Sequence, residues 1–148
     1  MIEEGSKFPD FSLPDQDGNI LSLSDLKGKE FVIYFYPKDD TPGCTAEACD
    51  FRDRADSLGK KLIGVSPDPV KSHKKFAEKY ELPFTLLADT EKTLCEAVGV
   101  WVEKSMYGKT YMGVERSTFV VGADGVVKKV YRKVKVPGHV ESIAKDIS

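Results

Sequence analysis

Two cysteines five positions apart, Cys44 and Cys49, are the residues of this sequence best suited to chemistry. Cys44 follows Thr41 and Pro42, a pair typical of a helix start, because threonine is a preferred N-cap and proline is tolerated at the first helical position. A thiol in the first helical turn lies beside free backbone N–H groups and the positive end of the helix dipole. These favour the thiolate, so the position predicts a reactive cysteine.

The spacing of the two cysteines limits what they can form. Residues five apart in an intact helix lie about 8–9 Å apart at Cα and point to different sides. A disulfide needs a Cα separation below about 7 Å, so Cys44 and Cys49 can join only if the helix unwinds locally. That would suit a switch that oxidises during turnover. The alternatives are that Cys44 is a small buried apolar residue and that Cys49 packs in the core, as we expect for Cys95 in its short amphipathic segment.

Composition and motifs exclude several functional classes. His73 and His139 are remote from the cysteines in sequence and no Cys-x-x-Cys pair occurs, which argues against a zinc site. The 22 basic and 24 acidic side chains give a net charge of −2, without the basic excess of a nucleic-acid binder. The apolar runs fall far short of the roughly 20 residues that span a bilayer. No signal segment is visible at the N-terminus, so we expect a cytoplasmic protein with reduced thiols.

The elements that would position these cysteines predict one α/β domain over residues 1–148. Strands that alternate with helices imply parallel crossovers, and a late hairpin adds antiparallel strands. We expect a mixed central sheet flanked by helices, with an N-terminal β-hairpin extension, whereas the segment between Gly99 and Gly113 shows no clear periodicity. The expected strands are 11–13, 20–23, 31–36, 62–66, 84–88, 117–121 and 126–131, and the expected helices are 42–58, 70–80, 91–98 and 140–147. Cys44 then follows the carboxyl end of a strand, where open α/β sheets bind ligands.

The string YPKDDTPGCT, from Tyr36 to Thr45, resembles the Pro-x-x-x-Thr-x-x-Cys active-site signature of the peroxiredoxins. With the second cysteine five residues on, it is similar to the peroxiredoxin Q, or bacterioferritin comigratory protein, group. The resemblance covers nearly the whole chain, through residues 99–101 and 108–111 to the Arg-Ser-Thr-Phe string that begins at Arg116. It implies a thioredoxin-like fold and a thiol-dependent peroxidase for hydrogen peroxide and organic hydroperoxides, with no metal or organic cofactor.

The resemblance also implies a role for each of five residues. Cys44 would be the peroxidatic cysteine, whose thiolate attacks the peroxide and becomes a sulfenic acid. Thr41 would hydrogen-bond the thiolate or the peroxide, besides capping the helix, and Pro37 would shield the site from water. Arg116 would stabilise the thiolate and the charge on the leaving oxygen. Cys49 would resolve the sulfenic acid as an intramolecular disulfide, which thioredoxin or a similar dithiol would reduce.

The residues alone leave other interpretations open. Thr41 is fully explained as a helix cap and Arg116 as a solvated or ion-paired side chain. Cys95 could replace Cys49 as the resolving partner. The same disulfide could serve a redox sensor or holdase, or a thioredoxin-like dithiol carrier, although the missing Cys-x-x-Cys argues against the carrier. We expect a monomer, because an intramolecular disulfide needs no partner chain.

Overall fold

A five-stranded mixed sheet forms the centre of the computed structural model, which describes residues 2–147, and residues 1 and 148 of the predicted domain lie outside the described residues. The strand order is β5-β4-β3-β8-β9, with β3, β4 and β5 parallel and β8 and β9 antiparallel to their neighbours. The strands are β3 (Phe31–Phe35), β4 (Lys61–Ser66), β5 (Thr85–Ala88), β8 (Ser117–Val121) and β9 (Val127–Tyr131). The predicted mixed α/β fold is therefore confirmed.

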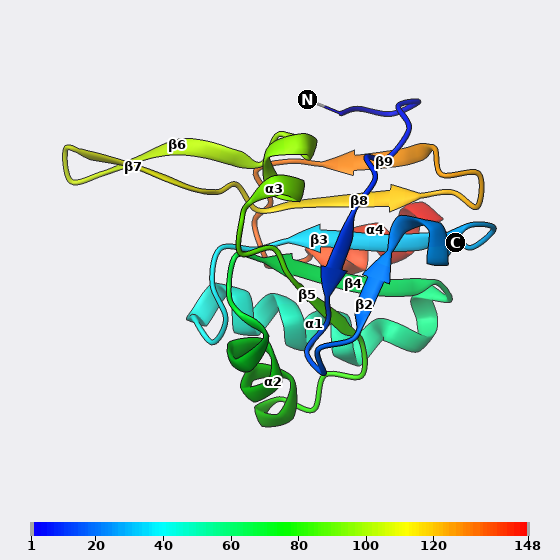
Figure 1. Cartoon of the computed structure of the whole chain (residues 1–148), viewed down its shortest axis with the longest axis horizontal. Coiled ribbons are helices and arrows are strands. Elements are labelled where there is room, and N and C mark those ends of the chain that lie inside the picture. The colour runs from blue at the N-terminus through cyan, green and yellow to red at the C-terminus, as the bar shows by residue number, and fades with distance from the viewer. Residues whose placement is uncertain (1, 148) are drawn as a thin grey trace.

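Helices cover both faces of this sheet, and a separate apolar core lies on each face (Figure 1). One core receives side chains from α1 (Pro42–Leu58), α2 (Val70–Lys79) and α4 (His139–Ile147). The other receives them from α3 (Thr93–Val98), the 3-10 helix η1 (Leu23–Leu26) and the N-terminal segment. Every residue of β3 is buried, as its continuous apolar sequence predicts for a strand inside a covered sheet.

The start and the end of α1 follow local sequence signals. Pro42 occupies the start of the helix, after Thr41 at the N-cap, and Gly59 follows its last residue with φ 64°, the left-handed conformation that glycine adopts without strain. Cys44, Ala48 and Phe51 lie on its buried face. Among the described residues, no helix is long and apolar enough to cross a membrane.

The predicted N-terminal hairpin is present as β1 (Ser12–Pro14) and β2 (Ile20–Ser22). Gln16 lies in the loop between these strands, and its side-chain amide forms the pair of hydrogen bonds that a neighbouring strand would form. It donates to the Phe84 carbonyl over 3.0 Å and accepts from the Leu86 N–H over 2.9 Å. These bonds occupy backbone groups at the outer edge of β5. The hairpin therefore covers an edge that would otherwise be open to pairing.

A second hairpin, β6 (Trp101–Met106) and β7 (Lys109–Val114), was not predicted from the sequence. It projects from the body of the protein as a long two-stranded arm (Figure 1). Most of its residues are exposed or only partly buried, and Tyr107 at its turn is 97% exposed. A strand pair with no buried face needs no apolar alternation, which explains why the sequence shows no period there. The other predicted elements agree with the structure to within two residues.

Candidate active site

Cys44 lies in the first turn of α1, beyond the carboxyl end of β3, as predicted. Its side chain is buried, with 2% exposure, and its sulfur accepts a hydrogen bond from Arg116 Nη2 over 3.4 Å. The two residues are 72 positions apart, and β8, which begins directly after Arg116, pairs with β3. The pairing of β8 with β3 thus brings a positively charged guanidinium within hydrogen-bond distance of the Cys44 sulfur.

Glu47, a residue not predicted from the sequence, completes this arrangement. Its Oε1 accepts from Arg116 Nη1 over 2.6 Å, while its Oε2 has no hydrogen-bond partner among the described residues. Burial of the carboxyl raises the pKa of Glu47 to about 7, against the opposing effect of the Arg116 charge. The sequence offered one signal for Glu47: its position three residues after Cys44 places an acidic side chain on the same, apolar face of the helix.

The side chain of Thr41 does not cap α1, which corrects one prediction. Its backbone carbonyl accepts the first helical hydrogen bond, from the Thr45 N–H over 2.8 Å, but its hydroxyl makes no cap bond. The hydroxyl of Thr41 instead donates to the Lys38 carbonyl over 2.8 Å. The proton is thereby directed toward the loop, and the lone pairs of Oγ1 are left to accept another hydrogen bond.

The remaining predicted site residues lie in or beside the same segment. Pro37 is half-buried in the loop between β3 and α1. Cys49 is half-buried farther along α1, and both it and Cys44 are free thiols inside an unbroken helix. Cys95 belongs to the apolar core on the opposite face of the sheet from Cys44. Burial and the nearby Asp89 carboxylate raise the pKa of Cys95 far above that of an ordinary thiol.

A second cation, Lys104 of β6, lies near the site. Its alkyl chain packs over Gly113 of β7, where an added Cβ would lie 3.3 Å from Lys104 Cδ. Partial burial and the neighbouring Arg116 charge lower the pKa of Lys104. The middle of the β6–β7 hairpin therefore adds positive charge to the surroundings of Cys44, a contribution that only the paired strands reveal.

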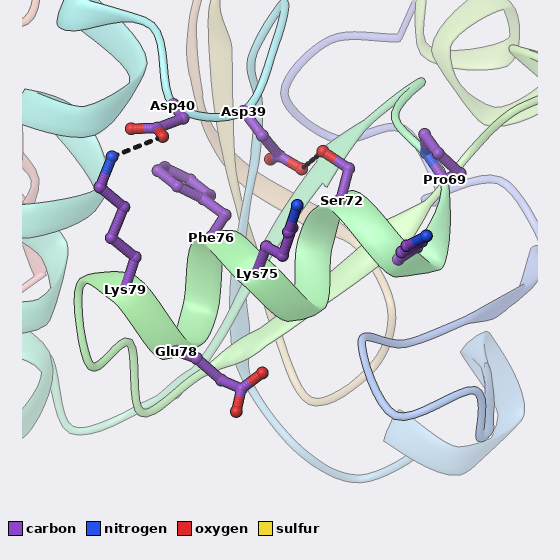
Figure 2. A pocket seen from close by; sticks show the side chains of 9 residues that line it. Asp39, Asp40, Pro69, Ser72, Lys75, Phe76, Glu78 and Lys79 are labelled. Atoms are coloured by element: carbon purple, nitrogen blue, oxygen red, sulfur yellow. Dashed lines mark hydrogen bonds and ion pairs between the residues drawn. The ribbon is translucent and has the colours of Figure 1, made fainter.

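Asp39, Asp68 and His73 bring potential metal-ligand atoms within 4.8 Å of one another. Asp39 Oδ2 lies 2.7 Å from His73 Nδ1, and Asp68 Oδ2 accepts from the Asp39 N–H over 2.8 Å. Because each of these side chains already has a hydrogen-bond partner in the protein, the cluster is explained without an ion. Beside it, a pocket of about 920 Å³ is lined by the loop before α1 and by exposed lysines of α2, and Figure 2 shows Asp39 and Asp40 along its rim.

The family is shown by comparison with known proteins. The profile of the AhpC/TSA family matches residues 5–130. Peroxiredoxin Bcp of Bacillus subtilis is 55% identical over 94% of this chain and 90% of its own length, and Peroxiredoxin Bcp of Escherichia coli is 45% identical over 93% and 90%.

Solved structures agree. A PrxQ mutant from Xylella fastidiosa superimposes with a TM-score of 0.93 at 34% identity, over 99% of this chain and 96% of that one. The bacterioferritin comigratory protein of Xanthomonas campestris, studied for alkyl peroxide reduction, gives a TM-score of 0.88 at 42% identity, over 93% and 89%. The chain therefore belongs to the AhpC/TSA family, among the Bcp and PrxQ peroxiredoxins, and is a thiol-dependent peroxidase.

Proposed function

We propose that Cys44 is the peroxidatic cysteine and that it reduces hydrogen peroxide and organic hydroperoxides. The observation that carries this is the 3.4 Å hydrogen bond from Arg116 Nη2 to the buried Cys44 sulfur. The thiolate attacks one peroxide oxygen, so an S–O bond forms as the O–O bond breaks. The leaving oxygen takes a proton to become water or an alcohol, and Arg116 stabilises the charge that develops on it. The alkyl peroxide activity studied in the Xanthomonas campestris relative supports the organic substrates.

Thr41 and Pro37 prepare the substrate site in this proposal. The Thr41 hydroxyl proton is held by the Lys38 carbonyl, so its oxygen accepts a hydrogen bond from the O–H of the incoming hydroperoxide. This contact selects the protonated peroxide and orients it toward the sulfur. Pro37 has no backbone N–H and limits the motion of the loop before α1, which helps to keep water from the thiolate.

Cys49 is the resolving cysteine in this proposal. Its thiol attacks the Cys44 sulfenic acid, forms the disulfide and releases water, after the first turns of α1 unwind to bring the sulfurs together. A thioredoxin-type dithiol then reduces this disulfide by thiol–disulfide exchange, becomes oxidised itself, and restores the thiols of Cys44 and Cys49. The cycle needs only one chain, which supports a monomer of one domain, residues 1–148. The cycle also needs a supply of reduced dithiol, which supports a cytoplasmic location of the protein.

Stopped-flow consumption of hydrogen peroxide by the fully reduced protein tests the role of Cys44. We expect a rate constant several orders of magnitude above that of a free thiol, lost in Cys44→Ser and retained in Cys95→Ser. Cys95→Ser is a matched control because it removes a buried thiol from the other face of the sheet. A wild-type rate like that of an ordinary thiol would contradict the proposal and favour the dithiol carrier.

A further inference from the structure

One peptide group in the loop before α1 connects a carboxylate to the Thr41 hydroxyl. The N–H of the Lys38–Asp39 peptide donates to Asp68 Oδ2 over 2.8 Å, and the carbonyl of the same peptide accepts from Thr41 Oγ1 over 2.8 Å. The N–H and C=O of a trans peptide are coplanar and point in opposite directions. The peptide therefore cannot turn without disturbing both hydrogen bonds, and the carboxylate on one side fixes the acceptor on the other.

Asp68 is itself held at the end of β4. The buried Ser66 hydroxyl donates to Asp68 Oδ2 over 2.6 Å, and the backbone N–H of Asp68 donates to Ser66 Oγ over 3.2 Å. These bonds fix the carboxylate against the central sheet rather than on the mobile part of a loop. The carboxylate that orients the Lys38–Asp39 peptide is therefore anchored at the end of β4.

The Asp39 side chain anchors the same peptide from its other end. Tyr36 donates to Oδ1 over 2.6 Å, Ser72 donates to Oδ2 over 2.8 Å, and His73 Nδ1 lies 2.7 Å from Oδ2. Figure 2 shows Asp39 directed at Ser72 of α2. His73 Nε2 faces the Leu87 carbonyl at 2.9 Å and so carries a proton. A further proton must lie between His73 and Asp39, because two lone pairs at that distance would repel.

We propose that Asp68 is a positioning residue for peroxide reduction: through the Lys38–Asp39 peptide, it sets the direction of the Thr41 hydroxyl. The buried contacts of Asp39 with α2 hold the peptide in the plane that makes this possible. Asp68 does not touch the substrate in this proposal, which rests on the proposed role of Thr41 as the acceptor for the peroxide O–H. It assigns a task in the reaction to Asp68 and His73, which lie outside the peroxidatic signature, and to Asp39, which occupies a variable position within it.

The first test compares two reactions of Cys44 in Asp68→Ala. The second-order rate constant with hydrogen peroxide should fall roughly three- to tenfold, the effect of one misplaced hydrogen bond. Alkylation by iodoacetamide should be unchanged, because it needs the thiolate but not Thr41. Asp68→Asn retains an oxygen acceptor for the Asp39 N–H and should restore most of the peroxide rate. Equal losses in both reactions, or no rescue by Asn, would overturn the proposal.

A double-mutant cycle with Thr41→Val separates this proposal from the one on which it rests. If Asp68 acts through Thr41, Asp68→Ala should slow the peroxide reaction in the wild-type background and have no further effect in Thr41→Val. An equal slowing in both backgrounds would reject the coupling and leave the role of Thr41 intact. If Thr41→Val itself reacts at the wild-type rate, the proposed role of Thr41 is wrong, and the positioning role of Asp68 falls with it.

Asp89 provides a matched control for the loss of a structural carboxylate. It follows β5, the strand beside β4, and accepts backbone N–H groups of Leu94 and Cys95 over 3.3 and 2.8 Å. Asp89→Ala, which loses its acceptor oxygens as Asp68→Ala does, should leave the peroxide rate unchanged. If Asp68→Ala does not fold, Ser66→Ala is placed in the same cycle, since it removes one of the bonds that fix the Asp68 carboxylate. A Ser66→Ala peroxide rate equal to wild type would then overturn the proposal.

Discussion

Arg116 joins Glu47 to Cys44, with Nη1 2.6 Å from the carboxylate and Nη2 3.4 Å from the sulfur. The carboxylate is fully buried, and the guanidinium side chain is only 16% exposed. A planar guanidinium can make both contacts at once because its donors form a rigid fork. Glu47 therefore determines where the positive charge lies relative to the sulfur.

Replacement of Glu47 by glutamine should remove a pH dependence of stability. The pKa of Glu47 is about 7 in the folded protein, above its ordinary value of 4.5. The folded state therefore holds a proton that the unfolded state loses as the pH rises from about 4.5 to about 7. This stabilisation, on the order of 3 kcal/mol, is complete below that range and lost above it. Urea unfolding at pH 5 and pH 8 should show a smaller difference in Glu47→Gln; equal differences would contradict this.

Replacement of Arg116 by lysine should slow the oxidation of Cys44 by peroxide roughly 100-fold, the loss typical of a removed electrostatic donor. A single ammonium cannot reproduce both contacts of the guanidinium. Stopped-flow measurement of the second-order rate constant checks this. Arg132→Lys is the matched control, because Arg132 donates to the backbone carbonyls of Ile2, Val98 and Gly99 and does not contact Cys44. Equal rates in the two variants would show that the position of the guanidinium does not matter.

Addition of one methyl group at Gly43 should disturb the site without removing any of its functional groups. A Cβ at this position would lie 3.2 Å from Arg116 Nη2, the atom that donates to the Cys44 sulfur, so the guanidinium must give by a few tenths of an ångström and its contact with the sulfur changes. We expect Gly43→Ala to react with peroxide roughly three- to tenfold more slowly. Thermal stability should not fall, because alanine favours the helix over glycine by up to about 1 kcal/mol. A slower reaction accompanied by a lower Tm would point to unfolding instead.

Comparison of Thr41→Val with Thr41→Ser shows whether the hydroxyl of Thr41 or the volume of its side chain is needed for peroxide reduction. Serine keeps the donor to the Lys38 carbonyl, whereas valine keeps the volume and loses the oxygen. The peroxide rate constant should fall at least roughly tenfold in Thr41→Val and stay near wild type in Thr41→Ser. Because the side chain makes no cap bond, the stability of α1 should change little in either variant. Equal rates in the two variants would contradict the proposed contact.

The two remaining cysteines should differ in their effect on turnover. Cys49→Ser should be oxidised at Cys44 by one equivalent of peroxide as fast as wild type, but should not cycle with a thioredoxin-type reductant. Cys95→Ser should cycle normally, because its buried thiol lies on the other face of the sheet. Mass spectrometry of the oxidised protein, with continuous peroxide consumption, distinguishes them. A disulfide that persists in Cys49→Ser and disappears in Cys95→Ser would reverse the assignment.

Local signals made much of the fold predictable. The limits of α1 follow from Pro42 and Gly59, and β3 follows from a continuous apolar sequence between polar segments. The β6–β7 hairpin gave no such signal, because neither of its faces is packed against the body over most of its length.

The site was predictable only where chemistry and sequence position coincide. Cys44 could be proposed from its place at a helix start, whereas Arg116 was assigned through a family resemblance, since strand pairing brings it across 72 positions. Glu47 could have been found from its spacing to Cys44. The hydrogen bonds of Asp39 with Asp68 and His73 depend on how closely β4 and α2 approach the loop before α1. The local sequence around these residues contains no signal of that approach.

The unbroken helix α1 holds both the proposed peroxidatic and the proposed resolving cysteine, so the two steps of the proposed cycle need different conformations of one segment. An ordered first turn keeps Cys44 against Arg116, and only a frayed one lets Cys49 approach. A newly formed sulfenic acid must therefore wait for α1 to fray, and during that wait a second peroxide molecule competes for the same sulfur. If the proposed cycle holds, the lifetime of the first turn sets how much peroxide the protein tolerates before its sulfur is irreversibly oxidised.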